Sequence, residues 1–93
     1  MLRHVVIWSM AEGHGGELDE VLRELRELPG QIEEIEALSA GPLLNESEFE
    51  AVLCVDVADA DALESYRSHP AHQPVLSRLR ATASDLLAAD YEY

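Results

Sequence analysis

The sequence contains no lysine, so all six of its basic residues are arginines. Nineteen aspartates and glutamates outnumber them and give a formal net charge of −13 at pH 7. Nucleic-acid binding depends on cationic neutralisation of phosphates, and anionic membrane surfaces attract basic segments. The charge therefore predicts that neither nucleic acid nor a membrane surface is a partner.

Cysteine and long apolar runs are equally scarce. Cys54 is the single cysteine, so no intrachain disulfide is expected, and its apolar neighbours indicate a small buried hydrophobe. No basic-then-apolar leader opens the sequence, and no apolar run approaches the length that spans a bilayer. We therefore expect a cytoplasmic location.

A chain of 93 residues has room for one hydrophobic core, so we expect a single domain over residues 1–93.

Hydrophobic periodicity divides the chain into alternating strands and helices. Strands are expected where β-branched and apolar residues alternate or cluster, at 2–10, 32–43, 49–57 and 87–93. Amphipathic helices are expected where apolar residues recur three and four positions apart, at 17–28, 59–66 and 70–86. Asp59 or Asp61 is expected to cap the second helix, with Asp61 and Glu64 forming a capping box, and a turn is expected at 45–48.

The order of these elements, βαββαβ, predicts an α+β fold of the ferredoxin-like type. In this fold an antiparallel four-stranded sheet carries its helices on one face. The opposite, partly apolar face would then be uncovered, and such a face requires a partner. A second copy packed sheet to sheet would cover it, so we expect a homodimer that encloses an eight-stranded barrel.

The segment from Tyr66 to His72 brings a phenol and two imidazoles to one helix junction. These side chains suit proton transfer near neutral pH. His69 lies where a helix cap belongs, so a capping role competes with a ligand-binding role. His72 lies in the first turn of the following helix, where its ring can pack or can point into a cavity.

Strand alternation places His4 and Trp8 on one face together with Leu2, Val6 and Met10. His4 is then a hydrogen-bonded core residue or a group that lines a pocket. Trp8 either lines the same pocket or fills it. His4, Trp8 and His69 are the candidate ligand-binding residues.

Three motifs occur in order along the chain, RHVVIW at 3–8, YxxHPAH at 66–72 and DYE at 90–92. Together they resemble the stress-responsive α/β-barrel domain family, a dimeric relative of the ferredoxin-like fold. The resemblance extends from Leu2 to Tyr93. It implies a dimeric α/β barrel, with a cavity between each sheet and its helices that opens near the His-Pro junction.

At least one plant member of that family is a cyclase that acts on a linear polyketide. The resemblance implies that His72 is the general base and that Tyr66 donates to a developing oxyanion or orients the base. His4 would line the pocket. The third strand lacks the histidine that the cyclase has near its start.

Two functions therefore remain open. The first is a non-catalytic homodimeric domain that binds a small apolar ligand or serves mainly as a stable dimer. The second is a cyclase- or lyase-type enzyme with a polyketide-like substrate, with His72 and Tyr66 as its catalytic residues. No metal and no cofactor are expected, because His69 and His72 lack further ligands at suitable spacing and no glycine-rich phosphate loop is present.

Overall fold

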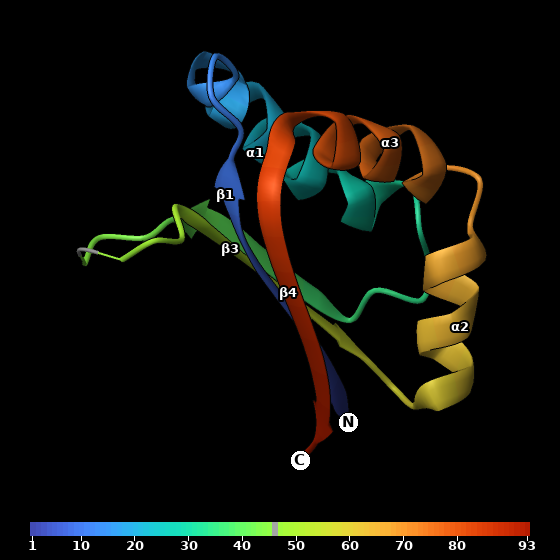
Figure 1. The fold of residues 1–93 in the computed structure, drawn as a ribbon. Coiled ribbons are helices and arrows are strands. Elements are labelled where there is room, and N and C mark those ends of the chain that lie inside the picture. Colours follow the sequence, from blue (N-terminus) through green and yellow to red (C-terminus); the bar gives the residue numbers. More distant parts are fainter. Residues whose placement is uncertain (46) are drawn as a thin grey trace.

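The computed structural model describes residues 1–45 and 47–93, which form a four-stranded antiparallel sheet with helices on one face (Figure 1). The strands lie in the order β2-β3-β1-β4. The strands are β1 (Leu2–Met10), β2 (Ala37–Pro42), β3 (Ala51–Val57) and β4 (Ala83–Glu92). The helices are α1 (Leu18–Glu27), α2 (Ala60–Ser68) and α3 (His72–Thr82), with short 3-10 turns η1 (Gly15–Glu17) and η2 (Leu28–Gly30). The predicted ferredoxin-like βαββαβ order is confirmed, with α2 and α3 sharing the second helical position.

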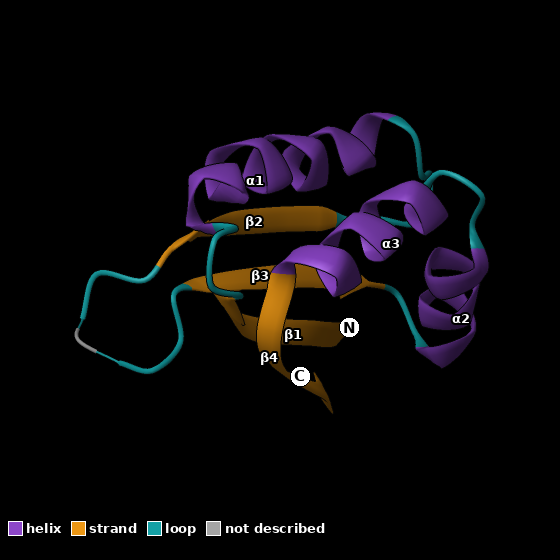
Figure 2. Cartoon of the chain, turned by 45° about the horizontal axis from the view of Figure 1, so that its top comes forward, coloured by secondary structure: helices purple, strands orange, loops and turns teal. Residues whose placement is uncertain are grey.

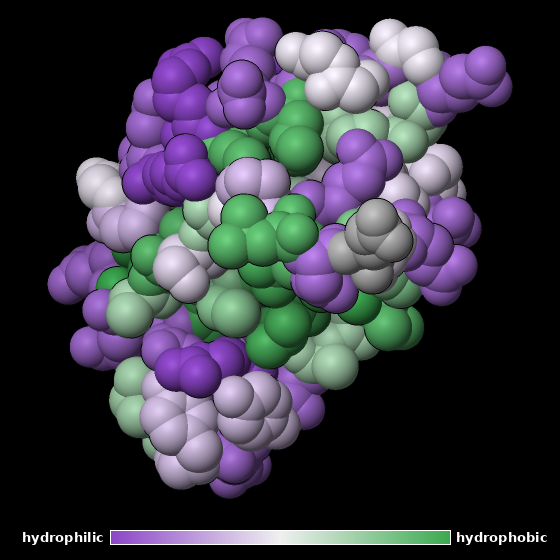
Figure 3. All heavy atoms as spheres, turned by 90° about the vertical axis from the view of Figure 1, so that its left-hand side faces the viewer, coloured by the Kyte–Doolittle hydropathy of each residue, from purple (hydrophilic) through white to green (hydrophobic). Residues whose placement is uncertain are grey.

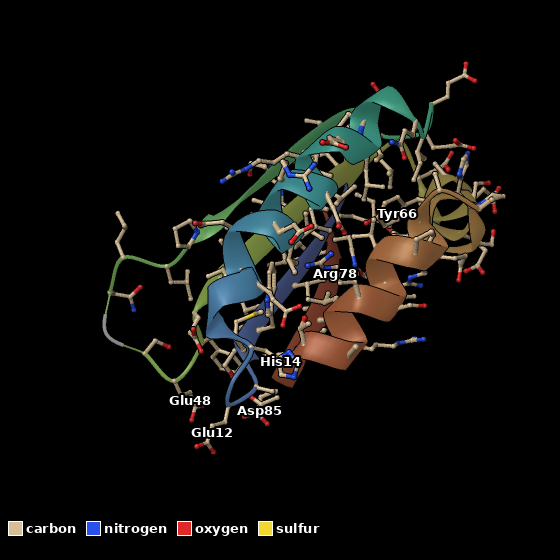
Figure 4. All side chains as sticks on the ribbon, turned by 90° about the horizontal axis from the view of Figure 1, so that it is seen from above. Glu12, His14, Glu48, Tyr66, Arg78 and Asp85 are labelled. Carbon is tan, nitrogen blue, oxygen red and sulfur yellow. The ribbon has the colours of Figure 1, made fainter. Side chains whose placement is uncertain are left out.

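Helices α1 and α3 lie across the same face of the sheet, and α2 lies at one end of it (Figure 2). The central strand β1 has the expected alternation, because its even-numbered residues are all buried beneath these helices. Val21, Leu22 and Leu25 of α1 are buried against the same core. Arg78 joins the two covering helices, since its guanidinium on α3 donates to Glu20 and Glu24 of α1 at 2.9 and 3.0 Å (Figure 4).

The opposite face of the sheet carries no helix among the described residues. Cross-strand partners share a face, and the register pairs Val5 with Cys54 and Ala89, and Ile7 with Val52 and Leu87. We call these six residues the open face: Val5, Ile7, Val52, Cys54, Leu87 and Ala89. Figure 3 shows apolar residues gathered across the middle of the side that lies to the left in Figure 1. Cys54 is half-buried on the open face, whereas the sequence predicted a small buried hydrophobe.

One end of this face is polar and internally paired. The Arg3 guanidinium donates to both carboxylate oxygens of Asp56, at 2.7 and 3.0 Å, and lies 4.8 Å from the ring centre of Tyr93. Hydrogen bonding to Arg3 lowers the pKa of the Asp56 carboxyl. The termini lie side by side there, with the Met1 amino group donating to the Tyr93 carbonyl at 3.2 Å (Figure 1).

Two strand boundaries differ from the prediction by several residues. β2 begins at Ala37 and not at Ile32, because the amides of Ile32 and Ile35 donate to preceding carbonyls in turns and are not available to a strand ladder. β4 begins at Ala83 and not at Leu87. The apolar residues before Leu87 are spaced as in a helix. The pairing of β4 with β1, which starts with Ala83 opposite Met10, nevertheless holds these residues extended. β3 begins at Ala51, two positions after the predicted start.

The helix ends around α2 also differ in detail. Asp59 is the cap, with its carboxylate accepting from the Ala62 amide at 2.9 Å, so the capping box expected at Asp61 does not form. Pro70 lies in the turn before α3 and not in its first helical turn. The turn predicted at 45–48 includes Glu46, which lies outside the described residues. None of the described helices combines the length and apolar character that crossing a membrane requires.

Candidate functional site

A cavity of about 370 Å³ lies between the sheet and the helices, where the His-Pro junction was expected to open one. Its walls are mainly apolar, with a few polar side chains among them. The strands contribute His4, Val6, Leu53, Leu86 and Ala88; the helices contribute Leu25, Tyr66, Arg67, His72, Val75, Leu76, Leu79 and Arg80. This composition matches that of small-molecule sites, which are apolar pockets with a small number of convergent polar groups.

The junction between α2 and α3 brings Tyr66 and His72 together in the cavity wall. Tyr66 ends the apolar face of α2, and His72 is the first residue of α3. Between them, His69 leaves the helical conformation and its Nδ1 accepts from the Ala71 amide at 3.0 Å, which fixes the turn. The Tyr66 and His72 ring centres are consequently 4.5 Å apart.

The Tyr66 hydroxyl is buried and has no hydrogen-bond partner among the described residues. Burial raises the pKa of the phenol to about 12, so it stays protonated near neutral pH. Figure 4 shows this side chain reaching from α2 toward the space beneath α1 and α3. A buried polar group of this kind normally has a partner, because leaving one unpaired costs about 1–3 kcal/mol. Tyr66 therefore offers the cavity an unused hydrogen-bond donor.

The hydrogen bonding of His72 defines which of its nitrogens carries the proton. Nδ1 lies 3.2 Å from the Arg67 carbonyl oxygen, which can only accept, so Nδ1 carries the hydrogen. Burial lowers the pKa of His72, which keeps the imidazole neutral at pH 7 and leaves Nε2 as an unprotonated acceptor. The side chain of Gln73 donates to the same carbonyl at 2.9 Å and helps to hold the junction. His72 therefore combines a fixed ring orientation with a free basic nitrogen.

His4 forms the third polar group of the cavity. Its Nδ1 lies 2.5 Å from Asp90 Oδ1, and Arg67 Nη2 donates to the other oxygen of that carboxylate at 2.7 Å. Partial burial raises the pKa of Asp90, but the His4 hydrogen bond and the Arg67 charge outweigh it, so the net shift is downward. The ionised carboxylate holds the His4 ring, whose centre is 6.1 Å from that of Tyr66.

Two of the predicted ligand-binding residues lie outside the cavity wall. Trp8 is fully buried in the core, and its indole nitrogen has no partner among the described residues. His69 is half-buried in the junction turn, where its backbone ends α2 and its ring accepts from the Ala71 amide. Of the five predicted site residues, the structure brings His4, Tyr66 and His72 together in the wall.

Sequence reasoning missed three polar residues of the site, Arg67, Arg80 and Asp90. Asp90 belongs to the DYE motif, but its contact with His4 follows from the pairing of β1 with β4, which sets these two residues opposite each other. Arg80 lies two helical turns after His72, and this spacing was an available signal. In the described part of the chain no group of three or more histidine, cysteine or acidic side chains is placed to hold a metal ion.

Comparison with known proteins identifies a family, a relative in sequence and solved structures to which this chain is similar. The family model of the stress responsive A/B barrel domain matches residues 2–93. The uncharacterised protein SCO4036 of Streptomyces coelicolor is 33% identical over 98 residues, covering 100% of both chains. A dimeric ferredoxin-like protein of Thermobifida fusca shares 20% identity at a TM-score of 0.88, over 99% of this chain and 90% of that one.

The hydroxynitrile lyase of Passiflora edulis also has this fold. It shares 12% identity at a TM-score of 0.86, over 97% of this chain and 90% of that chain. At such low identity the likeness to solved structures concerns the fold. The family match covers the strands, the helices and the Tyr66–His72 junction alike, and the chain belongs to the stress responsive A/B barrel domain family.

Proposed function

We propose that residues 1–93 act as one domain that forms a homodimer and binds a small, largely apolar molecule in the cavity of each protomer. The observation that carries this proposal is the buried Tyr66 hydroxyl, which has no partner among the described residues and lies in the wall of an apolar cavity. A ligand with one hydroxyl or carbonyl oxygen would accept from it, while its hydrocarbon part contacts the apolar wall. A cytoplasmic location stays a prediction.

The open face supports the homodimer. It is continuous and apolar across the strands, and Leu87 within it is 56% exposed. Faces of this kind on soluble domains are usually covered by a partner. The Thermobifida fusca protein of the same fold is described as dimeric, which is consistent with a second copy as that partner.

Octanol is a suitable probe for the cavity, because it combines an apolar chain with one hydroxyl. We expect calorimetry to detect octanol binding to the wild-type protein. We also expect Leu76→Trp, which places an indole in the cavity wall, to abolish it. Ser77→Trp adds the same ring to an exposed position on the same helix and should leave binding intact. Equal binding by both variants would place the probe outside the cavity.

A second candidate is an enzyme of the cyclase or lyase type, and the neutral His72 beside the Tyr66 donor favours it. His72 Nε2 would take a proton from a carbon next to a carbonyl group. The C–H electron pair would then move into an enolate, and the Tyr66 hydroxyl would donate to its oxygen. A polyketide-like substrate presents such acidic C–H groups.

Turnover separates this candidate from simple binding. A screen of β-dicarbonyl and polyketide-like compounds by exchange of the acidic C–H for deuterium would detect proton transfer without knowledge of the product. We expect His72→Ala to abolish exchange and Tyr66→Phe to slow it. An unchanged exchange rate in either variant would remove the enzyme hypothesis, whereas octanol binding without any exchange would favour the non-catalytic one.

A further inference from the structure

Arg80 differs from the other five arginines in its pairing. The others donate to a carboxylate or a carbonyl: Arg3 to Asp56, Arg23 to Glu27, Arg26 to the Ala40 carbonyl, Arg67 to Asp90, and Arg78 to Glu20 and Glu24. Arg80 has no hydrogen bond or ion pair within residues 1–45 and 47–93. In a chain with nineteen acidic residues, an unpaired guanidinium is unexpected.

The position of Arg80 is at the outer end of the cavity. His72, Leu76 and Arg80 follow one another at intervals of four along one face of α3, and all three line the cavity. The part of the wall that Tyr66 and His72 form is shielded from solvent, since both residues are buried. Arg80 is exposed, as are the lining residues Arg67, Leu86 and Ala88, so this exposed part of the wall marks the mouth.

The charge around the cavity is opposite to the charge of the whole protein. Two arginines line the cavity, and none of the described aspartates or glutamates does. Arg67 is already neutralised by Asp90, which leaves Arg80 as the available cation. Burial lowers the pKa of His72, and the charges of His4 and Arg80, which line the same cavity, lower it further.

We propose that Arg80 binds the carboxylate of an amphipathic ligand whose apolar part occupies the cavity. A guanidinium fork matches a carboxylate in two parallel hydrogen bonds, and an exposed position at the mouth keeps the anion in contact with water. This inference rests on the proposed function and specifies its ligand: a small apolar molecule with an acidic end, which enters apolar end first.

Octanoate and octanol test this inference as a pair, because they share an apolar chain and differ in charge. We expect the wild-type protein to bind octanoate about threefold to tenfold more tightly than octanol, a modest preference because Arg80 is exposed. Arg80→Gln should remove this preference by weakening octanoate binding to the level of octanol. Arg23→Gln makes the same charge change on an exposed part of α1 and should preserve it. Added salt should weaken octanoate binding alone.

The outcomes separate the two proposals. Equal binding of octanol and octanoate by the wild-type protein would overturn the role of Arg80 and leave the apolar site intact. The same conclusion follows if Arg80→Gln keeps the preference or if Arg23→Gln loses it. If neither probe binds to the wild-type protein, the apolar site itself is overturned, and the carboxylate site with it.

Discussion

At the scale of single residues, the cavity holds polar groups whose hydrogen-bonding capacity is not used within the protein. The Tyr66 hydroxyl is buried without a partner among the described residues, and the Nδ1 hydrogen bond of His72 leaves Nε2 free. A buried, unpaired hydroxyl such as that of Tyr66 reduces stability unless a ligand pairs with it, because its hydration is lost on folding. Stability and binding should therefore respond in opposite directions when this hydroxyl is removed.

Tyr66→Phe tests this opposition directly. Removing the unpaired hydroxyl should raise the free energy of unfolding by about 1 kcal/mol and weaken octanol binding about fivefold, since one neutral hydrogen bond is lost. Urea denaturation and calorimetry measure the two effects. A less stable variant would show that the hydroxyl already has a partner in the folded protein.

His72 should make stability depend on pH in a defined direction. Burial lowers its pKa in the folded protein below the ordinary histidine value of 6.5, so the unfolded chain binds the proton more readily. The contribution of the neutral His72 side chain to the free energy of unfolding is therefore fully present above about pH 6.5. It falls as the pH decreases from 6.5 to the lowered pKa of the folded protein. Asp90, whose folded pKa is also lowered, loses its contribution only below the ordinary aspartate value of 3.8.

His72→Gln provides the comparison for this prediction. Melting temperatures measured from about pH 8 to about pH 5, a range that spans the ordinary pKa of a histidine side chain, should fall less steeply in the variant than in the wild-type protein. Equal slopes would show that His72 is not the group whose protonation opposes folding.

Part of the site could be predicted from the sequence, and the rest depends on tertiary contacts. The spacing from Tyr66 to His72 fixed both residues at one junction, and strand alternation placed His4 on the covered face. Asp90 was not predictable as the partner of His4, because that contact requires the register between β1 and β4. Trp8 shares the face of His4, but it lies fully buried in the core and not in the cavity wall.

At the scale of elements, helix α2 and its ends position the site. Asp59 begins the helix by accepting from the Ala62 amide, and the junction turn ends it beside His72. Sequence reasoning predicted the helices and strands because their apolar periods are long and regular. It failed at the boundaries of β2 and β4, where turn hydrogen bonds and strand pairing override local propensity.

The cap of α2 offers a matched pair of variants. Asp59→Ala should lower the free energy of unfolding by about 1 kcal/mol, because the Ala62 amide loses its acceptor. Asp61→Ala removes an acidic residue from the same helical turn without removing a cap, so its effect should be only a few tenths of a kcal/mol, from the helix dipole. Urea denaturation compares the two. Equal losses would contradict the assignment of Asp59 as the cap.

At the scale of the whole molecule, the sheet separates two surfaces with different roles. One face packs against α1 and α3 and encloses the cavity, while the open face is uncovered in the single chain. The polar cluster of Arg3 and Asp56 is paired within the chain, so the apolar residues beside it are available to a partner. We infer that dimerisation and ligand binding use opposite faces.

Ile7→Glu tests the role of the open face. Ile7 lies on the central strand between Val52 and Leu87, so a carboxylate there would be desolvated in a dimer. We expect light scattering to show a dimer for the wild-type protein at micromolar concentration and a monomer for the variant, with a lower melting temperature. Ser77→Glu introduces the same charge on exposed α3 and should stay dimeric. A monomeric wild-type protein would contradict the proposal.

The most direct test of the cavity as a ligand site is an NMR titration of the four histidine rings with octanol. Figure 4 shows Tyr66 on the α2 side of the molecule and His14 well apart from it, in the loop before α1. If the ligand occupies the cavity, the ring signals of His72 and His4 shift with a common saturation curve and that of His14 stays in place. Unchanged His72 and His4 signals, or a shift of His14 that matches theirs, would contradict the account.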